Sequence, residues 1–348
     1  MFTDVYSNLK IKKDALILAI ESSCDETAAA IVKGGREILS NEIMSSCSEH
    51  VKFGGVVPEI ASRAHTTAVS VVTDRALKTA GVSLDDVDAI AVTYGAGLLG
   101  ALLVGVSYAK SLAFAKELPL VPVSHIRGHI AACYLNNPLI EPPFISLLAS
   151  GGHTAVICVK SYTEFDIIGQ TLDDAVGEAF DKVARVLGLE YPGGPNVERL
   201  AATGQNTIEL PKMFKGDKNN FNFTYSGLKT AVINYKHTCE QRGEACNDAD
   251  LACSFQCAAI DVLVEKTITA ARRMNIKTIT AGGGVAANGY LRARLEQECL
   301  SRKIKLFLPP KKLCTDNAAM IGAEGYIQYM QGNFAGLDLN AQASVPMC

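Results

Sequence analysis

Two histidines, His125 and His129, lie four residues apart in the apolar stretch "PVSHIRGHIAACYL" (122–135). Residues with this spacing share one face of a helix, so both imidazoles can point to the same place. Such a pair can supply part of a metal site, and it can equally pack in a core. Two imidazoles and one carboxylate form a set suited to Fe²⁺ or Zn²⁺ that leaves coordination positions open. The chemistry therefore depends on whether the fold brings an acid to this helix.

A second candidate group is the acidic turn "ESSCDET" (21–27), which follows the first apolar run of the chain. It holds three carboxylates, those of Glu21, Asp25 and Glu26. Acids gathered after a buried strand can bind a cation or serve as a general base. A surface turn rich in Ser and Asp has the same composition, so both interpretations stay open for this segment.

Two glycine-rich segments, "ASGGH" (149–153) and "AGGGVAAN" (281–288), can expose backbone N–H groups to a phosphate. Neither is a Walker motif or a GxGxxG motif. Between them, "DDAVGEAFDKVARVLGL" (173–189) has helical periodicity, and its apolar stripe consists of Val176, Phe180, Val183 and Leu187. Asp181 falls on the other side of this helix and is the acid best placed for ribose hydroxyls. These segments favour a nucleotide as ligand.

The elements that must position these residues alternate between strands and helices, and their order repeats. The pattern of strand, small-residue turn and strand at 15–32 recurs at 144–159. The pattern of strand, glycine loop and helix at 88–116 recurs at 278–300. "CTDNAAMIGAEGY" (314–326) then falls where the histidine helix falls in the first half. The order predicts a duplicated α/β fold.

We expect two lobes around a central cleft. The N-terminal lobe is predicted to span 1–141 and to be completed by 316–348, and the C-terminal lobe is predicted to span 142–315. Ligands of open α/β sheets bind where strand ends meet glycine turns. The duplication also suggests that Asp316, at the start of its helix, meets His125 and His129.

Composition limits the kind of protein. The 348 residues are 48% hydrophobic with a net charge of −3, which argues against a large basic surface and leaves nucleic acid to local patches. The basic runs at 272–273 and 302–305 are interpreted as solvated faces. Eleven cysteines without a CxxC pair, and an N-terminus without an apolar signal, predict reduced thiols in the cytoplasm. We expect no membrane span.

The motifs together resemble one family. They are "IESSCDET", "GGVVPEIASRAH", "HIRGHIAA", "LLASGGHT", "DDAVGEAFDKVARVLGLEYPGGP", "FTYSGLKTAV", "AGGGVAAN" and "CTDNAAMI". They are similar to the tRNA N6-adenosine threonylcarbamoyltransferases (TsaD in bacteria) over roughly residues 15–330. The resemblance implies an actin-like, sugar-kinase-like ATPase fold, abbreviated ASKHA. It also implies an acyltransferase that moves threonylcarbamoyl from threonylcarbamoyl-AMP to N6 of adenosine 37 in tRNAs reading ANN codons, with release of AMP.

The resemblance also assigns residues, cofactors and partners. It implies one divalent metal ion, Fe²⁺ as first choice and Zn²⁺ as second choice, held by His125, His129 and Asp316. It implies that Asp25 and Glu26 serve activity. The adenylate contacts that it implies are Leu148, Ala149, Ser150, Gly151, Gly152, Asp181, Gly194 and Asn288. The implied partners are tRNA, a TsaB paralogue and the TsaE ATPase, with no membrane.

One departure and three rival functions stand beside this resemblance. Arg127 occupies a position that is usually acidic in bacterial members, and we expect it to face solvent, tRNA or a partner rather than a metal. The family was formerly labelled a metalloendopeptidase, but Ile126 stands where the HExxH motif of zincins needs its glutamate base. The second rival function is that of a kinase or ATPase of the same fold, and the third is that of a non-catalytic scaffold.

Overall fold

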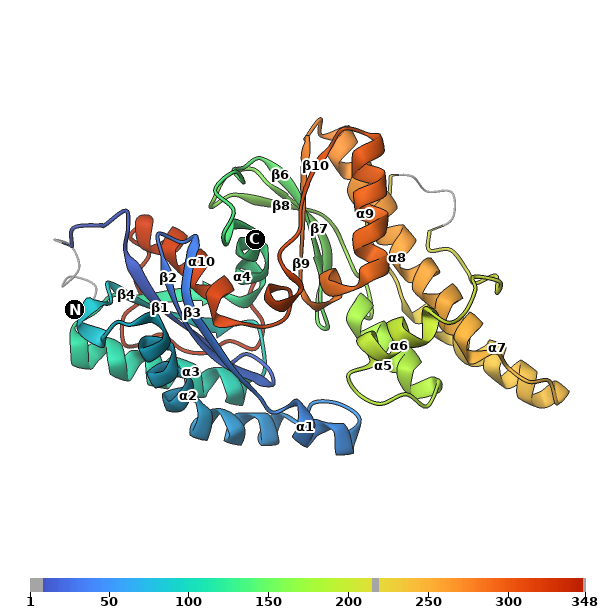
Figure 1. Cartoon of the computed structure of the whole chain (residues 1–348), viewed down its shortest axis with the longest axis horizontal. Coiled ribbons are helices and arrows are strands. Elements are labelled where there is room, and N and C mark those ends of the chain that lie inside the picture. The colour runs from blue at the N-terminus through green and yellow to red at the C-terminus, as the bar shows by residue number, and fades with distance from the viewer. Residues whose placement is uncertain (1–8, 215–218, 347–348) are drawn as a thin grey trace. The chain divides into compact units, whose positions relative to one another are not determined.

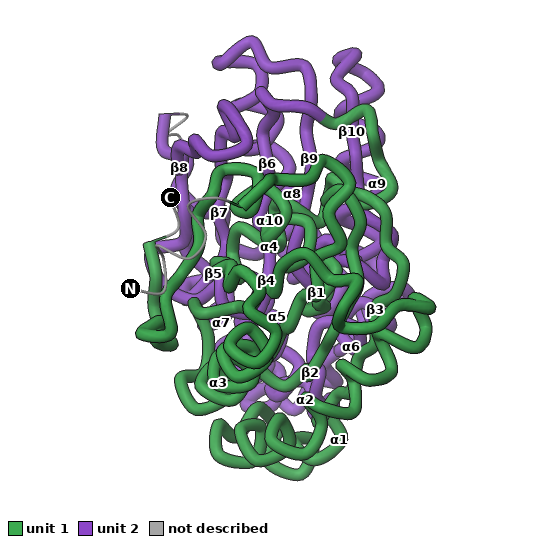
Figure 2. Tube along the Cα trace, turned by 90° about the vertical axis from the view of Figure 1, so that its left-hand side faces the viewer, with its two compact units in different colours: residues 1–140, 315–347 green, residues 141–314, 348 purple. Residues whose placement is uncertain are grey.

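The computed structural model describes residues 9–214 and 219–346 (Figure 1). The chain forms two compact units, which are coloured separately in Figure 2. Unit 1 consists of two segments of the chain, the first ending at Ile140 and the second beginning at Thr315. Unit 2 consists of Glu141–Cys314. Each unit has its own five-stranded sheet and its own hydrophobic core.

The sheet of unit 1 has the strand order β3-β2-β1-β4-β5. The first three strands are antiparallel to one another, and β4 and β5 continue the sheet in parallel to β1. Almost every residue of β1, β2 and β4 is buried, as their continuous apolar runs require. The bounds are β1 Leu16–Glu21, β2 Glu26–Lys33, β3 Glu37–Ser45, β4 Ala89–Gly95 and β5 Leu120–Ser124.

The sheet of unit 2 has the order β10-β9-β6-β7-β8. Its first three strands in sequence are antiparallel, and β9 and β10 extend the sheet in parallel to β6. Read from the first strand of each unit, the two sheets have the same order and the same directions, which confirms the predicted duplication. The bounds are β6 Phe144–Ala149, β7 Thr154–Val159, β8 Phe165–Gln170, β9 Thr278–Gly282 and β10 Lys305–Phe307.

Helices cover both faces of the sheet in unit 1. Successive residues of a strand point to opposite faces. Leu18 and Ile20 of β1 belong to the core shared with α2 (Pro58–Ala80) and α3 (Leu99–Lys116). Ile17 and Ala19 instead face α10 (Ala318–Met330), whose Gly322 and Gly325 would collide with sheet side chains if they carried a Cβ. The glycines therefore let α10 lie directly on the sheet, where it also packs against α4 (His125–Ala131).

The helices of unit 2 are α5 (Val176–Val186), α6 (Gly193–Ala201), α7 (Ser226–Arg242), α8 (Asp248–Arg273) and α9 (Gly289–Ser301). The predicted apolar stripe of α5 is buried along its whole length, from Val176 at 0% exposure to Leu187 at 7%. The long helix α8 contributes much of the core around α5. Helical periodicity predicted α5 and the repeat predicted α9, but α6, α7 and α8 were not predicted.

Among the described helices, α3 is the one that is long and apolar enough to cross a membrane by length and composition alone. One third of its residues are buried, and these lie in the core of unit 1 against β4 and α2. The apolar face of α3 is thus used, in part, by the fold. None of the ten cysteines that the structure describes takes part in a disulfide.

Candidate metal centre and adenylate site

The two histidines of the stretch 122–135 lie on α4, which begins directly at the end of β5. His125 is the first residue of the helix and His129 lies one turn later, so their rings meet edge to face with centroids 4.6 Å apart. Both side chains are buried, His129 almost completely at 2% exposure. A buried pair of imidazoles needs partners for its ring nitrogens.

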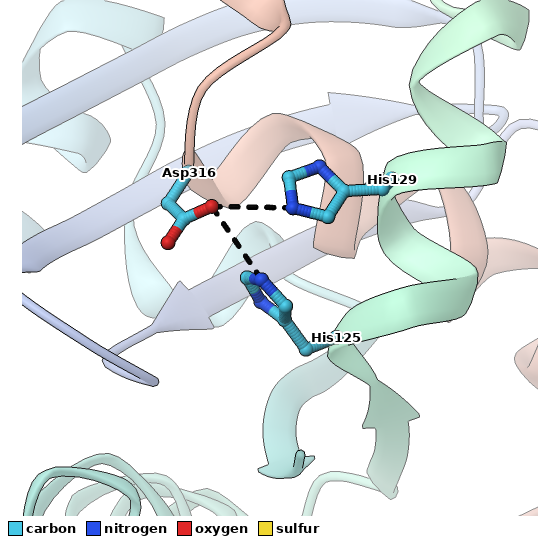
Figure 3. A group of neighbouring side chains, drawn as sticks. All are labelled: His125, His129 and Asp316. Carbon is cyan, nitrogen blue, oxygen red and sulfur yellow. Dashed lines mark ion pairs between the residues drawn. The ribbon is translucent and has the colours of Figure 1, made fainter. Parts of the chain in front are cut away.

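The acid that the histidines require is Asp316, which lies just before α10 (Figure 3). The next residue, Asn317, caps this helix by accepting a hydrogen bond from the backbone N–H of Met320 at 3.1 Å. This cap fixes the direction in which the chain enters α10. Asp316 Oδ1 lies 3.4 Å from His125 Nε2 and 3.2 Å from His129 Nε2. All three side chains belong to unit 1.

The donor set fits a single divalent metal ion. One ligand atom from each of the three residues lies within 4.8 Å of the others. Neighbouring ligands at ~2.1 Å from one metal ion lie about 3 Å apart, close to the separations found here. In addition, both ring nitrogens of His129 are buried without a hydrogen-bond partner in the described structure. A metal ion on Nε2 would satisfy one of these two buried atoms.

Charge attraction among the side chains also stabilises the centre. Burial alone would raise the pKa of Asp316, but the imidazoles of His125 and His129 hold it well below its usual range. Burial would likewise lower the pKa of His125, but Asp316 and Glu21 raise it well above its usual value. A proton on His125 thus balances two carboxylates. A divalent cation among these groups would take over that role.

Glu21 is a functional candidate that the sequence analysis named only as one of three acids. It ends β1 and is completely buried, and its Oε2 lies 3.2 Å from His125 Nδ1. Burial would raise the pKa of Glu21, but His125 outweighs this effect and lowers it. An ionisable residue at the end of an otherwise apolar, buried strand is the sequence signal that could have singled it out.

The other two acids of this turn, Asp25 and Glu26, lie where β1 passes into β2. Asp25 is 8% exposed, and the Ser45 hydroxyl donates to Glu26 Oε1 at 3.1 Å. Burial, reinforced by the negative charge of Asp25, raises the pKa of Glu26 to about 9. At neutral pH, Glu26 is therefore a protonated acid next to a second carboxyl group. Both acids lie in unit 1, and their role in activity stays a prediction.

The backbone of this acidic turn is fixed by two buried polar groups. Ser46 donates to the carbonyl oxygen of Asp25 through both its N–H and its hydroxyl, each at 2.9 Å. His65, which is fully buried on α2, binds the Cys24 carbonyl through Nε2 at 2.9 Å and the Thr27 hydroxyl through Nδ1 at 2.7 Å. These contacts hold Asp25 in a defined position, which a proton-transfer group needs.

Arg127 forms an ion pair that was not predicted from the sequence. Its Nε lies 3.0 Å from Oε1 of Glu324 on α10, and the arginine side chain is only 23% exposed. A contact of the remaining exposed part of Arg127 with solvent, tRNA or a partner stays a prediction, and the observed contact is the ion pair. The physical reason is that Glu324, 2% exposed, needs a counter-charge inside unit 1.

The predicted adenylate residues all lie in unit 2. Residues 148–152 lie at the carboxyl end of β6, Asn288 follows β9, and Asp181 and Gly194 lie on α5 and α6. These strands are parallel neighbours, with Leu148 paired to Gly282. Leu148 and Ala149 are 0% exposed, so only their backbone can face a ligand. Gly283, with φ +91°, packs so closely on Ala149 that a Cβ would lie 2.4 Å from its carbonyl oxygen. The two glycine segments therefore form one surface.

The loop after β6 has the features of a phosphate cradle. The N–H of Ser150 donates to the His153 carbonyl at 2.8 Å, which closes a tight turn around Gly151 and Gly152. The N–H groups of these two glycines have no acceptor in the described part of the chain, and a Cβ on either would meet open space. Free amides beside open space are what an anion requires.

Asp181 on α5 faces the start of α6. Its Oδ1 accepts the Gly193 N–H at 2.7 Å, and a second backbone contact comes from Gly194. Burial raises the pKa of Asp181. The carboxylate keeps acceptor capacity beyond these contacts, as a group that binds ribose hydroxyls would need.

Asn288 is more constrained than its sequence position suggested. Its Oδ1 caps α9 by accepting the Leu291 N–H at 3.0 Å, and its Nδ2 donates to Gln256 Oε1 at 3.0 Å. One amide hydrogen is left for a ligand. The N–H of Gly289 next to it is bound by Glu198 Oε1 at 2.7 Å. Gln256 and Glu198 are therefore supporting residues that sequence reasoning did not identify.

Comparison with known proteins identifies the group to which this chain is related. The family model described as tRNA N6-adenosine threonylcarbamoyltransferase (TsaD) matches residues 37–323. The proteins of that name from Staphylococcus saprophyticus and Clostridium novyi are 51% and 52% identical to it over 95% of this chain, and they are covered to 96% and 97%.

Solved structures show the fold alone. Full-length HypF matches with TM-score 0.61 and 16% identity, over 93% of this chain and 47% of that one. Component A of (R)-2-hydroxyglutaryl-CoA dehydratase from Acidaminococcus fermentans matches with TM-score 0.52 and 17% identity, over 91% and 99%. The fold is thus of the predicted ASKHA class, and the chain belongs to the tRNA N6-adenosine threonylcarbamoyltransferase family.

Proposed function

We propose that this protein transfers the threonylcarbamoyl group from threonylcarbamoyl-AMP to N6 of adenosine 37 in tRNAs that read ANN codons. The single observation that carries the proposal is the convergence of His125, His129 and Asp316 in unit 1 of a chain with this family membership. The donor is a mixed anhydride, so AMP is a good leaving group. The acceptor, an exocyclic adenine amine, is a weak nucleophile and must be presented unstacked from the anticodon loop.

In the proposed reaction, N6 attacks the carbamoyl carbon, and the bond from that carbon to the phosphate oxygen breaks. AMP leaves with the electron pair of this bond, and the amine loses one proton. Asp25 is proposed to accept that proton or to orient the amine, beside Glu26, whose pKa of about 9 keeps it protonated. A metal ion on the triad, when bound, would supply positive charge toward the carbonyl or phosphate oxygens.

The adenylate is proposed to bind unit 2. The free amides of Gly151 and Gly152 would hold the phosphate, together with the backbone at Leu148, Ala149 and Ser150. A separate set of contacts would hold the nucleoside, namely Asp181, Gly194 and Asn288. The unpartnered glycine amides and the unused acceptor capacity of Asp181 support this assignment.

The proposal extends to cofactor, lobes and partners. We assign Fe²⁺ as the metal ion, with Zn²⁺ as the second choice, because two imidazoles and one carboxylate suit either. The two units would be the two lobes of the enzyme, 1–141 with 316–348 and 142–315. A TsaB paralogue and the TsaE ATPase are the proposed protein partners, and the reaction is placed in the cytoplasm. A metalloendopeptidase function lacks support, because Ile126 is an apolar, buried residue where a base would stand.

The test is single-turnover transfer with purified threonylcarbamoyl-AMP, the metal-loaded chain with its partner proteins, and an ANN-decoding tRNA transcript. Formation of modified nucleoside with equimolar AMP is the expected result. A transcript with guanosine in place of adenosine 37 is the matched control. Absence of modified nucleoside in this mixture would refute the transferase. ATP hydrolysis by the chain alone, in a separate reaction supplied with ATP, would then favour an ATPase of the same fold.

A further inference from the structure

We propose that Glu21 is a positioning residue of the metal centre: its carboxylate receives the Nδ1 proton of His125 and so leaves Nε2 as the ligand nitrogen. This inference rests on the metal centre of the proposed function. Glu21 would be a fourth, buried residue of the centre. It does not bind the metal ion itself but determines which nitrogen of His125 does. Carboxylates in this place behind a histidine fix its tautomer and its ring orientation.

The ring of His125 lies between two carboxylates. Its Nδ1 is 3.2 Å from Glu21 Oε2, and its Nε2 is 3.4 Å from Asp316 Oδ1. An ionised carboxylate only accepts hydrogen bonds, so a bare nitrogen facing it would set two lone pairs against each other. When a cation takes the Nε2 lone pair on the side of Asp316, the ring proton has to sit on Nδ1, facing Glu21.

Glu21 itself is locked in place by donors on both oxygens. The backbone N–H of Ser23 donates to Oε1 at 2.5 Å, and the Thr93 hydroxyl donates to Oε2 at 2.5 Å. Because Glu21 is 0% exposed, no solvent competes for these contacts. The carboxylate therefore has a fixed orientation, with one lone pair of Oε2 left for His125.

A hydroxyl group also lies within hydrogen-bond distance of Nδ1. Ser23 Oγ is 3.1 Å from that nitrogen and could either donate or accept. If it donated to a bare Nδ1, the ring proton would move to Nε2 and block the ligand position. Glu21 excludes this arrangement because its oxygen cannot donate. Ser23 is thus expected to accept, sharing the Nδ1 proton with Glu21.

Glu21→Gln tests whether the ring proton of His125 lies on Nδ1 or on Nε2, and it hardly changes the size of the side chain. The Ser23 N–H can only donate, so the single amide oxygen of Gln is held on that side. Its NH₂ group then replaces Oε2 and points at His125 Nδ1. A donor there favours a bare Nδ1 and a protonated Nε2, the tautomer that cannot bind a metal ion through Nε2. The same exchange leaves the ligands themselves untouched.

The experiment measures zinc affinity by competition with a chromogenic chelator, and it reads the ring protons of His125 by ¹⁵N NMR in the zinc-loaded full chain. We expect a hydrogen-bonded proton on Nδ1 in the wild type. We expect Glu21→Gln to lower zinc affinity by about 10–100-fold, as loss of such a carboxylate does. Glu42→Gln on β3, whose carboxylate binds only the Thr79 hydroxyl in the described structure, is the matched control and should keep full affinity.

The outcomes distinguish Glu21 from the metal centre. Full zinc affinity in a folded Glu21→Gln chain overturns the inference while the centre stands. If that variant does not fold, the ¹⁵N NMR spectrum of the zinc-loaded wild type provides the test. Absence of a proton on Nδ1 of His125 in that spectrum would refute the proposal. Zinc uptake that His129→Ala leaves unchanged refutes the centre and Glu21 together. A correct tautomer and metal content without tRNA modification refutes only the transferase.

Discussion

Arg127 Nε lies 3.0 Å from Glu324 Oε1, so an ion pair joins the helix that carries both histidines to the helix that follows Asp316. Gln328 donates a second contact to the same Glu324 oxygen at 2.6 Å. Helices α4 and α10 are packed against each other, and their relative position sets the distance between Asp316 and the imidazoles. The pair therefore stabilises the packing of the two helices that position the metal ligands.

This ion pair predicts a specific dependence of stability on pH. Burial, opposed by Arg127, raises the pKa of Glu324 to about 7 from an unfolded value of 4.5. A raised pKa means that the folded chain binds this proton more tightly, so the stability it contributes is lost as pH rises from about 4.5 through 7. Glu324→Gln mimics the protonated acid. From pH 5 to pH 8, the variant should gain about 2–3 kcal/mol relative to the wild type.

Denaturant unfolding at the two pH values checks this expectation. Glu59→Gln, which breaks the exposed pair with Arg63 on α2, is the control and should change stability by no more than about 0.5 kcal/mol at either pH. If Glu324→Gln is less stable than the wild type by the same amount at both pH values, Glu324 is ionised at both. The raised pKa of Glu324 would then be refuted.

The metal centre predicts loss of metal without loss of fold. His129→Ala removes one of three donors from a site that has no spare ligand within the triad. Metal content measured by elemental analysis should fall from one ion per chain to nearly none, and tRNA modification should stop. His237→Ala, an exposed histidine on α7 in unit 2, should keep both. Retention of one ion per chain in His129→Ala would remove this residue from the ligand set.

The sequence predicted the strands and α5 well because their signals are local. Buried apolar runs and a helical stripe such as Val176 to Leu187 do not depend on distant residues. The repeat carried the prediction further, because it aligned Asp316 with the histidine helix. The partner of Arg127 could not be predicted, since Glu324 meets it only after α10 has packed on α4. The contact of Glu21 with His125 could not be predicted either. It depends on how the chain turns after β1 and on the rotamer of the His125 ring.

The glycine loop of unit 2 predicts a ligand effect without a folding effect. A Cβ at Gly152 would meet no protein atom within 4 Å other than those of its chain neighbours, so Gly152→Val should leave the fold intact. The added methyl groups would occupy the space beside the free amides, and binding of a non-hydrolysable threonylcarbamoyl-AMP analogue should weaken at least about tenfold, or 1.4 kcal/mol. Calorimetry measures this change. Gly227→Val on α7, equally unhindered, is the control, and equal affinity for both variants would exclude Gly152 from the site.

The acidic turn predicts an effect on the chemical step. Asp25 is held by two hydrogen bonds from Ser46 to its backbone carbonyl, so Asp25→Asn should keep its position. Asparagine retains the size and one acceptor oxygen but loses the charge and the basicity. Removal of a general base costs ~10²–10⁴ in rate, so single-turnover transfer should slow by that factor. Binding of the adenylate analogue should stay unchanged, because the proposed adenylate contacts lie in unit 2.

Three measurements on the same preparation make the Asp25 prediction specific. Transfer from purified threonylcarbamoyl-AMP isolates the chemical step, calorimetry reports adenylate binding, and elemental analysis reports metal content. Asp85→Asn, which removes an exposed partner of Lys116 in the same unit, should match the wild type in all three. A normal transfer rate in Asp25→Asn would exclude a chemical role. A slow rate accompanied by loss of the metal ion would instead place Asp25 among the metal ligands, because a proton-transfer residue outside the triad has no reason to control metal content.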